Sequence, residues 1–248
     1  MNSPTVDGVT QVWVTGRHSS LAQFLSAFPS VSLTEVPVLD FRSCPVDKTI
    51  LQSLRQSQKG WIIFSSPRAV EYFNRFEEGA AALQRLKVAC VGRTTASAVE
   101  ALGATVSYVP SSGVGTEAFL HGFPLAERGV AYLPAASGGR EAIEKFLRES
   151  GWEVNRFSVY ESQSHPQLPV LAQEIQRRIA PGDVILFTSP SSVEALLGVI
   201  SVPKGVRLAA IGKFTESALA KRNLNAWICR GADWGEFGRW LLGSREKD

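Results

Sequence analysis

The sequence predicts an α/β protein made of two doubly wound domains with parallel sheets, and two observations lead to this fold class. Short apolar runs alternate along the chain with stretches whose apolar residues recur at helical spacing, as in Trp61 to Phe64 followed by Ala69, Val70 and Phe73. The same order of strands, turns and helices then returns in the second half. Strands that alternate with helices form parallel sheets covered on both faces, with ligand sites at the carboxyl ends of the strands.

In the first half, each expected strand runs into a turn or a helix. The strands are 12–14, 33–39, 61–64, 88–91 and 106–109, and helices are expected around 21–25, 50–54, 69–76 and 98–102. Ser66 is a natural N-cap, and Pro67 suits the first helical position, where no N–H group is needed. Gly103 ends its helix, as a residue in the left-handed conformation just beyond a helix should.

The second half repeats this order of elements. Its expected strands are 130–133, 154–160, 184–187 and 208–211, with helices around 143–147 and 193–197, a helix that stops near Asn223, and a closing amphipathic helix over 234–242. Residues 165–169 contain two prolines and are expected to form a linker.

Two pairs of matching turns indicate that the chain is an approximate internal duplication. Phe64 and Phe187 precede similar Ser-Ser-Pro and Thr-Ser-Pro turns 123 residues apart, and Gly92 and Gly212 open similar turns 120 residues apart. The helix after each of these glycines ends eleven residues further on, at Gly in the first half and at Asn in the second. Gly and Asn are the residues that best tolerate the left-handed cap. The loops of the two halves are therefore expected to face a shared cleft.

Length, charge and cysteine content restrict the class of protein. With 248 residues, 44% of them apolar and 20% charged, the chain is an ordinary globular protein of one large or two smaller domains. A net charge of +3 with scattered Lys and Arg permits acidic ligands but predicts no nucleic-acid binding. Three widely separated cysteines favour a reducing compartment, and the N-terminal MNSPTVDGVTQ lacks the features of a signal peptide. No apolar run approaches membrane-spanning length, so a cytoplasmic protein without a membrane partner is expected.

The turns after the strands carry hydroxyl groups and basic side chains, nearly all at expected helix N-termini. The candidate ligand-binding residues are Thr15, Arg17, Ser65, Ser66, Arg93, Thr95, Ser137, Gly138, Arg140, Ser189, Lys213 and Thr215. Helix N-termini carry partial positive charge and free N–H groups, so this set suits a ligand with several carboxylates or phosphates. The alternative for any single turn is helix capping alone, because Ser and Thr are favoured there in every protein.

Familiar catalytic and metal-binding patterns are missing from the sequence. His18, His121 and His165 lie far apart without metal-ligand spacing, and the chain has no nucleophile elbow, phosphate-binding loop or dinucleotide fingerprint. No metal and no cofactor is therefore expected. Tyr160 ends a strand where the chain passes from one half to the other, so its hydroxyl is a candidate for chemistry. The alternative is a strand aromatic half buried in packing.

The order and spacing of several motifs resemble those of the uroporphyrinogen-III synthase family over nearly the whole chain. The motifs are FSSPRAV at 64–70, VGRTTA at 91–96, PAASGGR at 134–140, VYESQSHP at 159–166, FTSPSSV at 187–193 and IGKFTESA at 211–218. The resemblance implies two flavodoxin-like domains joined by a two-stranded linker. One domain is discontinuous, over 1–37 plus 166–248, and the other covers 38–165.

The resemblance also implies a reaction, a substrate and a set of site residues. The family cyclises hydroxymethylbilane, a linear tetrapyrrole with many carboxylates, to uroporphyrinogen III, losing water and inverting the terminal pyrrole ring without a metal or cofactor. Tyr160 matches the tyrosine proposed to assist loss of the hydroxyl group, and Ser66, Thr95, Ser189 and Thr215 match the carboxylate-binding turns. A monomer is implied, and the enzyme that forms hydroxymethylbilane is a candidate partner.

Two positions depart from the family pattern, and two other classes of function remain open. Phe214 stands where many members have a hydroxyl residue, and Glu216 stands where they have a small one. Glu216 would repel substrate carboxylates if it faced them, although it favours the helix dipole in a first turn. The open alternatives are a non-catalytic binding protein or sensor for a polyanionic small molecule, and a different doubly wound enzyme that acts on a phosphorylated substrate.

Overall fold

A computed structural model describes residues 9–243 except 114, 127 and 230–232. Residues 1–8, which hold most of the stretch where no signal peptide is expected, lie outside the described residues. The chain divides into two compact units, and each is considered by itself. Unit 1 consists of Met1–Asp40 and Gln163–Asp248, and unit 2 consists of Phe41–Ser162. This division falls three residues from each predicted domain limit.

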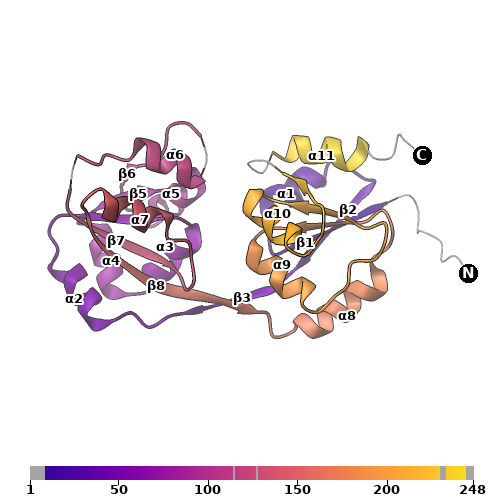
Figure 1. The fold of residues 1–248 in the computed structure, drawn as a ribbon, viewed down its shortest axis with the longest axis horizontal. Coiled ribbons are helices and arrows are strands. Elements are labelled where there is room, and N and C mark those ends of the chain that lie inside the picture. Colours follow the sequence, from indigo (N-terminus) through magenta and orange to yellow (C-terminus); the bar gives the residue numbers. More distant parts are fainter. Residues whose placement is uncertain (1–8, 114, 127, 230–232, 244–248) are drawn as a thin grey trace, which may run out of the picture. The chain divides into compact units, whose positions relative to one another are not determined.

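Unit 1 contains a parallel sheet with helices on both faces (Figure 1). Its strands lie in the order β11-β10-β9-β1-β2. The strands are β1 (Thr10–Thr15), β2 (Val31–Val36), β9 (Val184–Phe187), β10 (Arg207–Ala210) and β11 (Trp227–Ile228), and the helices are α1 (Ser19–Leu25), α8 (Leu168–Arg178), α9 (Pro190–Leu197), α10 (Lys213–Ala220) and α11 (Trp234–Gly243). Numbered along the chain from the other edge, this order is 2-1-3-4-5, the flavodoxin arrangement.

Unit 2 contains the second sheet, with strands in the order β3-β8-β7-β4-β5-β6. The strands are β3 (Leu39–Ser43), β4 (Trp61–Phe64), β5 (Lys87–Cys90), β6 (Val106–Tyr108), β7 (Val130–Ala136) and β8 (Glu153–Ser164), and the helices are α2 (Lys48–Gln56), α3 (Pro67–Phe73), α4 (Glu77–Leu83), α5 (Arg93–Glu100), α6 (Gly115–Gly122) and α7 (Ala142–Glu149). From β4 to β8 all neighbouring strands pair in parallel, in the other doubly wound order, 3-2-1-4-5. The predicted α/β class with two parallel sheets is confirmed.

The chain passes between the units twice, once within β3 and once within β8, and these two strands are neighbours. The Cys44 N–H donates to the Val159 carbonyl at 3.0 Å, and the His165 N–H donates to the Val38 carbonyl at 3.0 Å. The later residue of one segment therefore pairs with the earlier residue of the other, so the two segments run antiparallel. This is the arrangement that a two-stranded linker requires.

Alternate residues of each strand point to opposite faces of the sheet, and each face has its own apolar core. In unit 2, Ile62 and Phe64 of β4 pack under α2, α3, α4 and α5, whereas Trp61 and Ile63 pack under α6 and α7. Unit 1 is built in the same way, with α8, α9 and α10 on one face and α1 and α11 on the other. Strands covered on both faces read as continuous apolar runs, which is why these strands were easy to predict.

Three sequence expectations are wrong in detail. The single strand expected over 33–39 is two strands, because Pro37 between β2 and β3 has no N–H group for a ladder. The linker expected over 165–169 is partly helical, since α8 begins at Leu168 with Pro169 in its first turn, where a proline is tolerated. Helices α4, α6 and α8 and strand β11 were not predicted, and α4, α6 and β11 are short.

The matching helix ends are confirmed by the backbone. Gly103 has a φ of +73°, and Asn223 has a φ of +58°. Asn223 is the only residue other than glycine with positive φ in the part of the chain that the structure describes. The internal duplication therefore extends to the conformation of single residues, because only Gly and Asn adopt this cap readily.

We expect Ser66→Ala to lower the free energy of unfolding of unit 2 by about 1 kcal/mol. Ser66 is the N-cap of α3, and its hydroxyl accepts a hydrogen bond from the Ala69 N–H at 3.1 Å. Urea unfolding followed by circular dichroism measures this loss, and Ser66→Asp, which keeps an acceptor at the cap, is the control. An alanine variant as stable as the wild type would show that the cap contributes nothing.

No helix in the described part of the chain is both long and apolar enough to cross a membrane.

Candidate functional site

The sheet of unit 2 has one point where its winding reverses, between β4 and β7. The chain continues from β4 to β5 on one side and from β7 to β8 on the other, so the turns that follow β4 and β7 diverge. Ligands of doubly wound proteins bind in the crevice at such a point, outside the carboxyl ends of the strands. The turn after β4 carries Ser65 and Ser66, and the loop after β7 spans residues 137–140.

A pocket of about 230 Å³ lies at this reversal point. Its polar lining comes from Ser65, Ser66, Thr116, Arg140, Arg156 and Tyr160, and apolar residues of both strands, including Ile63 and Leu133, also line it. Four of the predicted site residues are thus brought together within one unit: Ser65, Ser66, Arg140 and Tyr160. The pocket joins two arginines to hydroxyl groups, which is a lining suited to a carboxylate or a phosphate.

Ser65 and Ser66 reach the pocket from the N-terminal end of α3. Ser66 is half-buried and its hydroxyl caps the helix, as described above, whereas Ser65 is exposed. Pro67 fills the first helical position, as predicted. The capping interpretation of Ser66 is therefore correct, and it does not conflict with a place in the pocket wall.

Tyr160 lines the pocket from within β8, with its ring packed in an aromatic group. The expectation that Tyr160 ends its strand is wrong, because β8 continues to Ser164 and pairs with β3. Its side chain is buried, and its ring centroid lies 5.4 Å from that of Tyr72 and 6.1 Å from that of Phe41. The guanidinium of Arg68 stacks over Phe41 at 3.4 Å and lies 5.9 Å from the Tyr160 ring centroid. The packing alternative for Tyr160 thus describes its ring, while the candidate for chemistry is its hydroxyl.

The loop over 137–140 joins β7 to α7 and carries three predicted site residues. Ser137 and Gly138 are exposed on this loop, and Arg140 reaches the pocket. Arg140 is exposed along part of its length, and partial burial of its guanidinium lowers its pKa. The Arg140 side chain stays charged at any physiological pH, because the ordinary pKa of arginine is so high.

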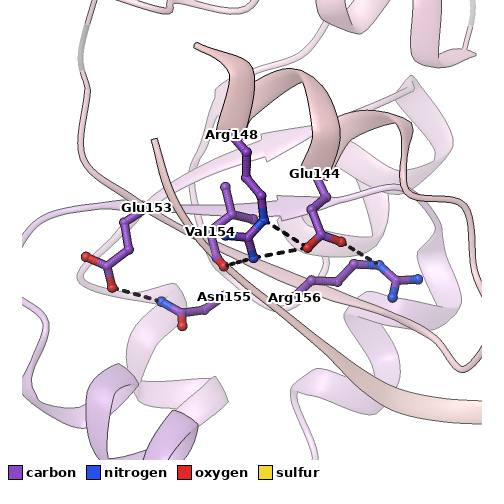
Figure 2. Close-up of polar contacts among 6 residues, drawn as sticks. All are labelled: Glu144, Arg148, Glu153, Val154, Asn155 and Arg156. Atoms are coloured by element: carbon purple, nitrogen blue, oxygen red, sulfur yellow. Dashed lines mark hydrogen bonds and ion pairs between the residues drawn. The ribbon is translucent and has the colours of Figure 1, made fainter. Parts of the chain in front are cut away.

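Arg156 of β8 contacts this loop and also pairs with Glu144 of α7. Figure 2 shows Arg148 and Arg156 approaching the Glu144 carboxylate from two sides. Arg156 also donates to the Gly139 carbonyl at 2.6 Å, and Arg148 donates to the Val154 carbonyl at 2.6 Å. An arginine-carboxylate-arginine group therefore ties the strand, the helix and the loop together.

Sequence reasoning missed Thr116, Gly139 and Arg156 as pocket residues. A charged residue within a predicted strand, between Val154 and Phe157, was a signal for Arg156, because such charges are seldom buried without a partner. The partner could not be named from the sequence, because Glu144 lies in the preceding helix and reaches Arg156 only in the folded unit. Gly139 was one of several glycines in a turn, without any feature that set it apart.

The remaining candidates of unit 2, Arg93 and Thr95, lie in the first turn of α5. Arg93 is exposed and Thr95 is buried. Gly92 caps this helix without a side chain. The Thr95 N–H donates to the Gly92 carbonyl at 3.1 Å, which leaves the N–H groups of Arg93 and Thr94 for a ligand or for solvent. A Cβ atom at Gly92 would meet no other atom within 4 Å, so the space in front of these groups is open.

In unit 1, Thr15 is buried at the reversal point between β1 and β9, and its hydroxyl is used within the protein. It accepts a hydrogen bond from the Thr188 N–H at 3.0 Å and lies 2.9 Å from the Ser192 hydroxyl. Ser189 caps α9 in a reciprocal capping box with Ser192. The hydroxyl groups of Thr15 and Ser189 therefore both stabilise the turn after β9.

The other candidates of unit 1 flank the turn that precedes α10 or the turn after β1. Thr215 is buried, whereas Lys213 and Arg17 are exposed. Gly212 caps α10 without a side chain, and its added Cβ would again meet nothing within 4 Å. Phe214, the departure from the family pattern, has 59% of its surface exposed, and Glu216 is half-buried in the first helical turn.

Cysteine chemistry finds no support in either unit. Burial raises the pKa of the Cys90 thiol to about 12 and that of the Cys229 thiol to about 11. Such thiols stay protonated near neutral pH and are poor nucleophiles. Among the described residues, no group of three or more His, Cys, Asp and Glu side chains could hold a metal ion.

Comparisons with known proteins agree in one family. The family model described as uroporphyrinogen-III synthase HemD matches residues 30–234. The uroporphyrinogen-III synthase of Synechococcus elongatus is 28% identical over 207 residues, which cover 79% of this chain and 75% of the relative. The chloroplastic uroporphyrinogen-III synthase of Oryza sativa subsp. japonica is 27% identical over 239 residues, which cover 91% of this chain and 76% of the relative.

Two solved structures show the same fold. The uroporphyrinogen-III synthetase of Helicobacter pylori matches with a TM-score of 0.67 and 18% identity, covering 94% of this chain and 99% of that chain. A mutant uroporphyrinogen III synthase of Thermus thermophilus matches with a TM-score of 0.62 and 19% identity, covering 97% of this chain and 100% of that chain.

Proposed function

The chain belongs to the uroporphyrinogen-III synthase family, and we propose that the pocket of unit 2 holds part of its tetrapyrrole substrate. The activity is that of a cyclising lyase of tetrapyrrole biosynthesis. The observation that carries the proposal is the convergence of Ser65, Ser66, Arg140 and Tyr160 on one pocket at the reversal point of the sheet. The sequence pattern alone had already marked each of these four residues as a candidate.

The pocket accounts for the binding of an anionic side chain of the substrate. A carboxylate of hydroxymethylbilane enters between the β4 turn and the loop over 137–140, where Arg140 and the hydroxyl groups are its partners. The uncapped first turns of α5 and α10 supply N–H groups for further carboxylates. Distributed contacts of this kind fold a flexible chain into one conformation, which is the main requirement of a ring closure.

Tyr160 supplies the one chemical step that the protein must assist. The pyrrole nitrogen expels the terminal hydroxyl group of the substrate, and the departing oxygen gains negative charge. The Tyr160 hydroxyl donates a proton to that oxygen, so that water leaves, and the tyrosinate regains a proton when the attacked pyrrole carbon releases its own on ring closure. Spontaneous closure gives the uninverted ring and needs no protein. The protein therefore directs inversion through the conformation in which it holds the substrate.

Further parts of the proposal concern the organisation of the whole chain. The domains are 1–37 plus 166–248 and 38–165, residues of both bind the substrate, and the protein acts in the cytoplasm as a monomer. Thr15, Arg17, Ser137, Gly138, Ser189 and Lys213 are included as residues near that substrate. The enzyme that forms hydroxymethylbilane is its expected partner.

The proposed function is tested by incubation with freshly prepared hydroxymethylbilane. The products are oxidised to porphyrins, and the type I and type III isomers are separated by chromatography. We expect mainly the type III isomer, whereas heat-denatured protein should give only type I from spontaneous closure. Saturable binding with only type I product would instead identify a binding protein or sensor.

We expect Gly92→Ala and Gly212→Ala each to raise KM by about fivefold, equivalent to ~1 kcal/mol of lost substrate binding. Both glycines have extended backbones, with φ of −159° and 178°, so alanine fits without strain. Since the added methyl groups meet no protein atom within 4 Å, they can obstruct only a ligand. Steady-state kinetics measures KM, and thermal melts check that the stability of each variant is unchanged. Wild-type KM in the double variant would show that no ligand approaches these turns.

A further inference from the structure

We propose that Arg156 is a positioning residue, which holds the loop over 137–140 in the conformation that presents Arg140 to the substrate. The inference rests on the proposed function of the pocket. It concerns a residue that lines the pocket and approaches Glu144 in Figure 2, but that was in none of the sequence motifs and not among the predicted site residues.

Two backbone hydrogen bonds tie this loop to the strands that flank it. The Ser137 N–H donates to the Tyr160 carbonyl at 2.8 Å, and the Gly139 N–H donates to the Ala136 carbonyl at 3.0 Å. Gly138 between them adopts a φ of +67°, which most other residue types adopt only with strain. The middle of the loop therefore depends on contacts from outside for a defined conformation.

Arg156 provides the external contact to the middle of the loop. Its Nη2 donates to the Gly139 carbonyl at 2.6 Å, and its Nε lies 3.7 Å from the Glu144 carboxylate. Only 17% of the Arg156 side chain and 21% of the Glu144 side chain are exposed. Hydrogen bonds from a charged donor in a partly buried place are stronger than those between neutral groups. One guanidinium thus connects β8, the loop and the first turn of α7.

Gly139 is shaped for this contact. A Cβ atom at this position would lie 3.0 Å from the Ala136 carbonyl oxygen and 3.3 Å from Arg156 Nη2. A side chain there would separate the loop from the guanidinium, so glycine permits the close approach. Because φ of Gly139 is not positive, crowding rather than backbone conformation is the reason for glycine here.

The loop and the candidate catalytic residue are connected by the backbone. The register of β7 against β8 shifts between Ala135 and Ala136, so Ala136 pairs with Tyr160, and the next residue, Ser137, donates to the Tyr160 carbonyl. A displaced loop would lose this hydrogen bond and would also move Arg140 away from the pocket. By holding the loop, Arg156 therefore affects the positions of both Arg140 and Tyr160.

Arg148 offers a matched control. It also donates to one backbone carbonyl at 2.6 Å and also contacts Glu144, at 3.0 Å, but its carbonyl partner is Val154 of β8 and not a residue of the loop. Arg148→Met and Arg156→Met therefore each remove one positive charge, one carbonyl contact and one partner of Glu144. Only Arg156→Met removes a contact to the loop.

The experiment compares wild type, Arg156→Met, Arg156→Lys and Arg148→Met in the full chain. Hydrogen exchange of the free proteins, read by mass spectrometry on peptides that cover residues 134–141, reports the order of the loop without substrate. Steady-state kinetics with hydroxymethylbilane reports KM and kcat. We expect Arg156→Met to speed exchange in this peptide and to raise KM by about tenfold, the effect of one lost charged hydrogen bond. Arg156→Lys should recover part of both effects, and Arg148→Met should show neither.

Unchanged loop exchange in Arg156→Met would overturn the inference, and so would faster exchange with a wild-type KM. Equal changes in the Arg148→Met variant would also overturn it, since they would show a general loss of stability. The exchange measurement needs no substrate, so it can be read even if the wild-type protein does not convert hydroxymethylbilane. That last result would contradict the proposed function and not the role of Arg156 in the loop.

Discussion

Tyr160→Phe is expected to lower kcat by about a hundredfold or more while KM changes less than about threefold. The substitution removes only the hydroxyl group, which the proposed mechanism uses in the transition state. The phenyl ring that remains keeps its packing against Tyr72 and Phe41, so the pocket should keep its shape. The measurement is a steady-state assay of type III product over a range of hydroxymethylbilane concentrations.

Tyr72→Phe is the matched control for this prediction. Tyr72 lies beside Tyr160, and its hydroxyl donates to the Phe41 carbonyl at 2.9 Å within the protein. Its loss should cost about 1 kcal/mol of stability and leave kcat near the wild-type value. Wild-type turnover in Tyr160→Phe, or an equal loss in Tyr72→Phe, would remove Tyr160 from the mechanism.

The parts of the fold that sequence reasoning predicted are those determined locally. The strands at 61–64 and 184–187 were predicted with their observed limits, because buried parallel strands are uniform apolar runs that end at a turn. The caps at Gly103 and Asn223 were predicted because the left-handed conformation that ends a helix depends on the residue type at a single position. Repetition of the same order in both halves made each of these predictions safer.

The candidate site was predictable only where its chemistry lies in a turn. Ser66 and Arg140 were found because they lie in the turn or loop that follows a strand, and the carboxyl ends of parallel strands lie at one edge of the sheet. Arg156 was missed because its role depends on two partners, the Gly139 carbonyl and the Glu144 carboxylate, that meet it through β7, β8 and α7. A sequence pattern cannot show which side of a strand faces which helix.

Thr15 illustrates the opposite difficulty. A threonine after a strand was a reasonable candidate for ligand binding, yet its hydroxyl accepts the Thr188 N–H and is buried between β1 and the turn after β9. Hydroxyl groups satisfy backbone groups of neighbouring turns as readily as they satisfy ligands. The sequence shows that a hydroxyl is present at an edge but not whether a neighbouring turn already uses it.

Gly79→Ala is expected to lower the free energy of unfolding of unit 2 by about 3 kcal/mol or more. Gly79 is buried in α4, where an added Cβ would lie 2.3 Å from the Phe73 carbonyl oxygen and 3.2 Å from its carbon. The carbonyl cannot move away freely, because it accepts a hydrogen bond from the Phe76 N–H at 3.2 Å. The Phe73 side chain is fully buried against Phe64, so the end of α3 is fixed as well. The connection between α3 and α4 must therefore open to admit the methyl group.

Thermal and urea unfolding of Gly79→Ala and Gly92→Ala measure this effect with an internal comparison. Both substitutions add one methyl group at a glycine of unit 2, but the methyl group at Gly92 enters open space. We expect only Gly79→Ala to melt at a lower temperature, and only Gly92→Ala to raise KM without a loss of stability. If Gly79→Ala were as stable as Gly92→Ala, the close approach of α4 to the end of α3 would be wrong. The two variants would then not distinguish a packing defect inside unit 2 from obstruction of a ligand at the edge of its sheet.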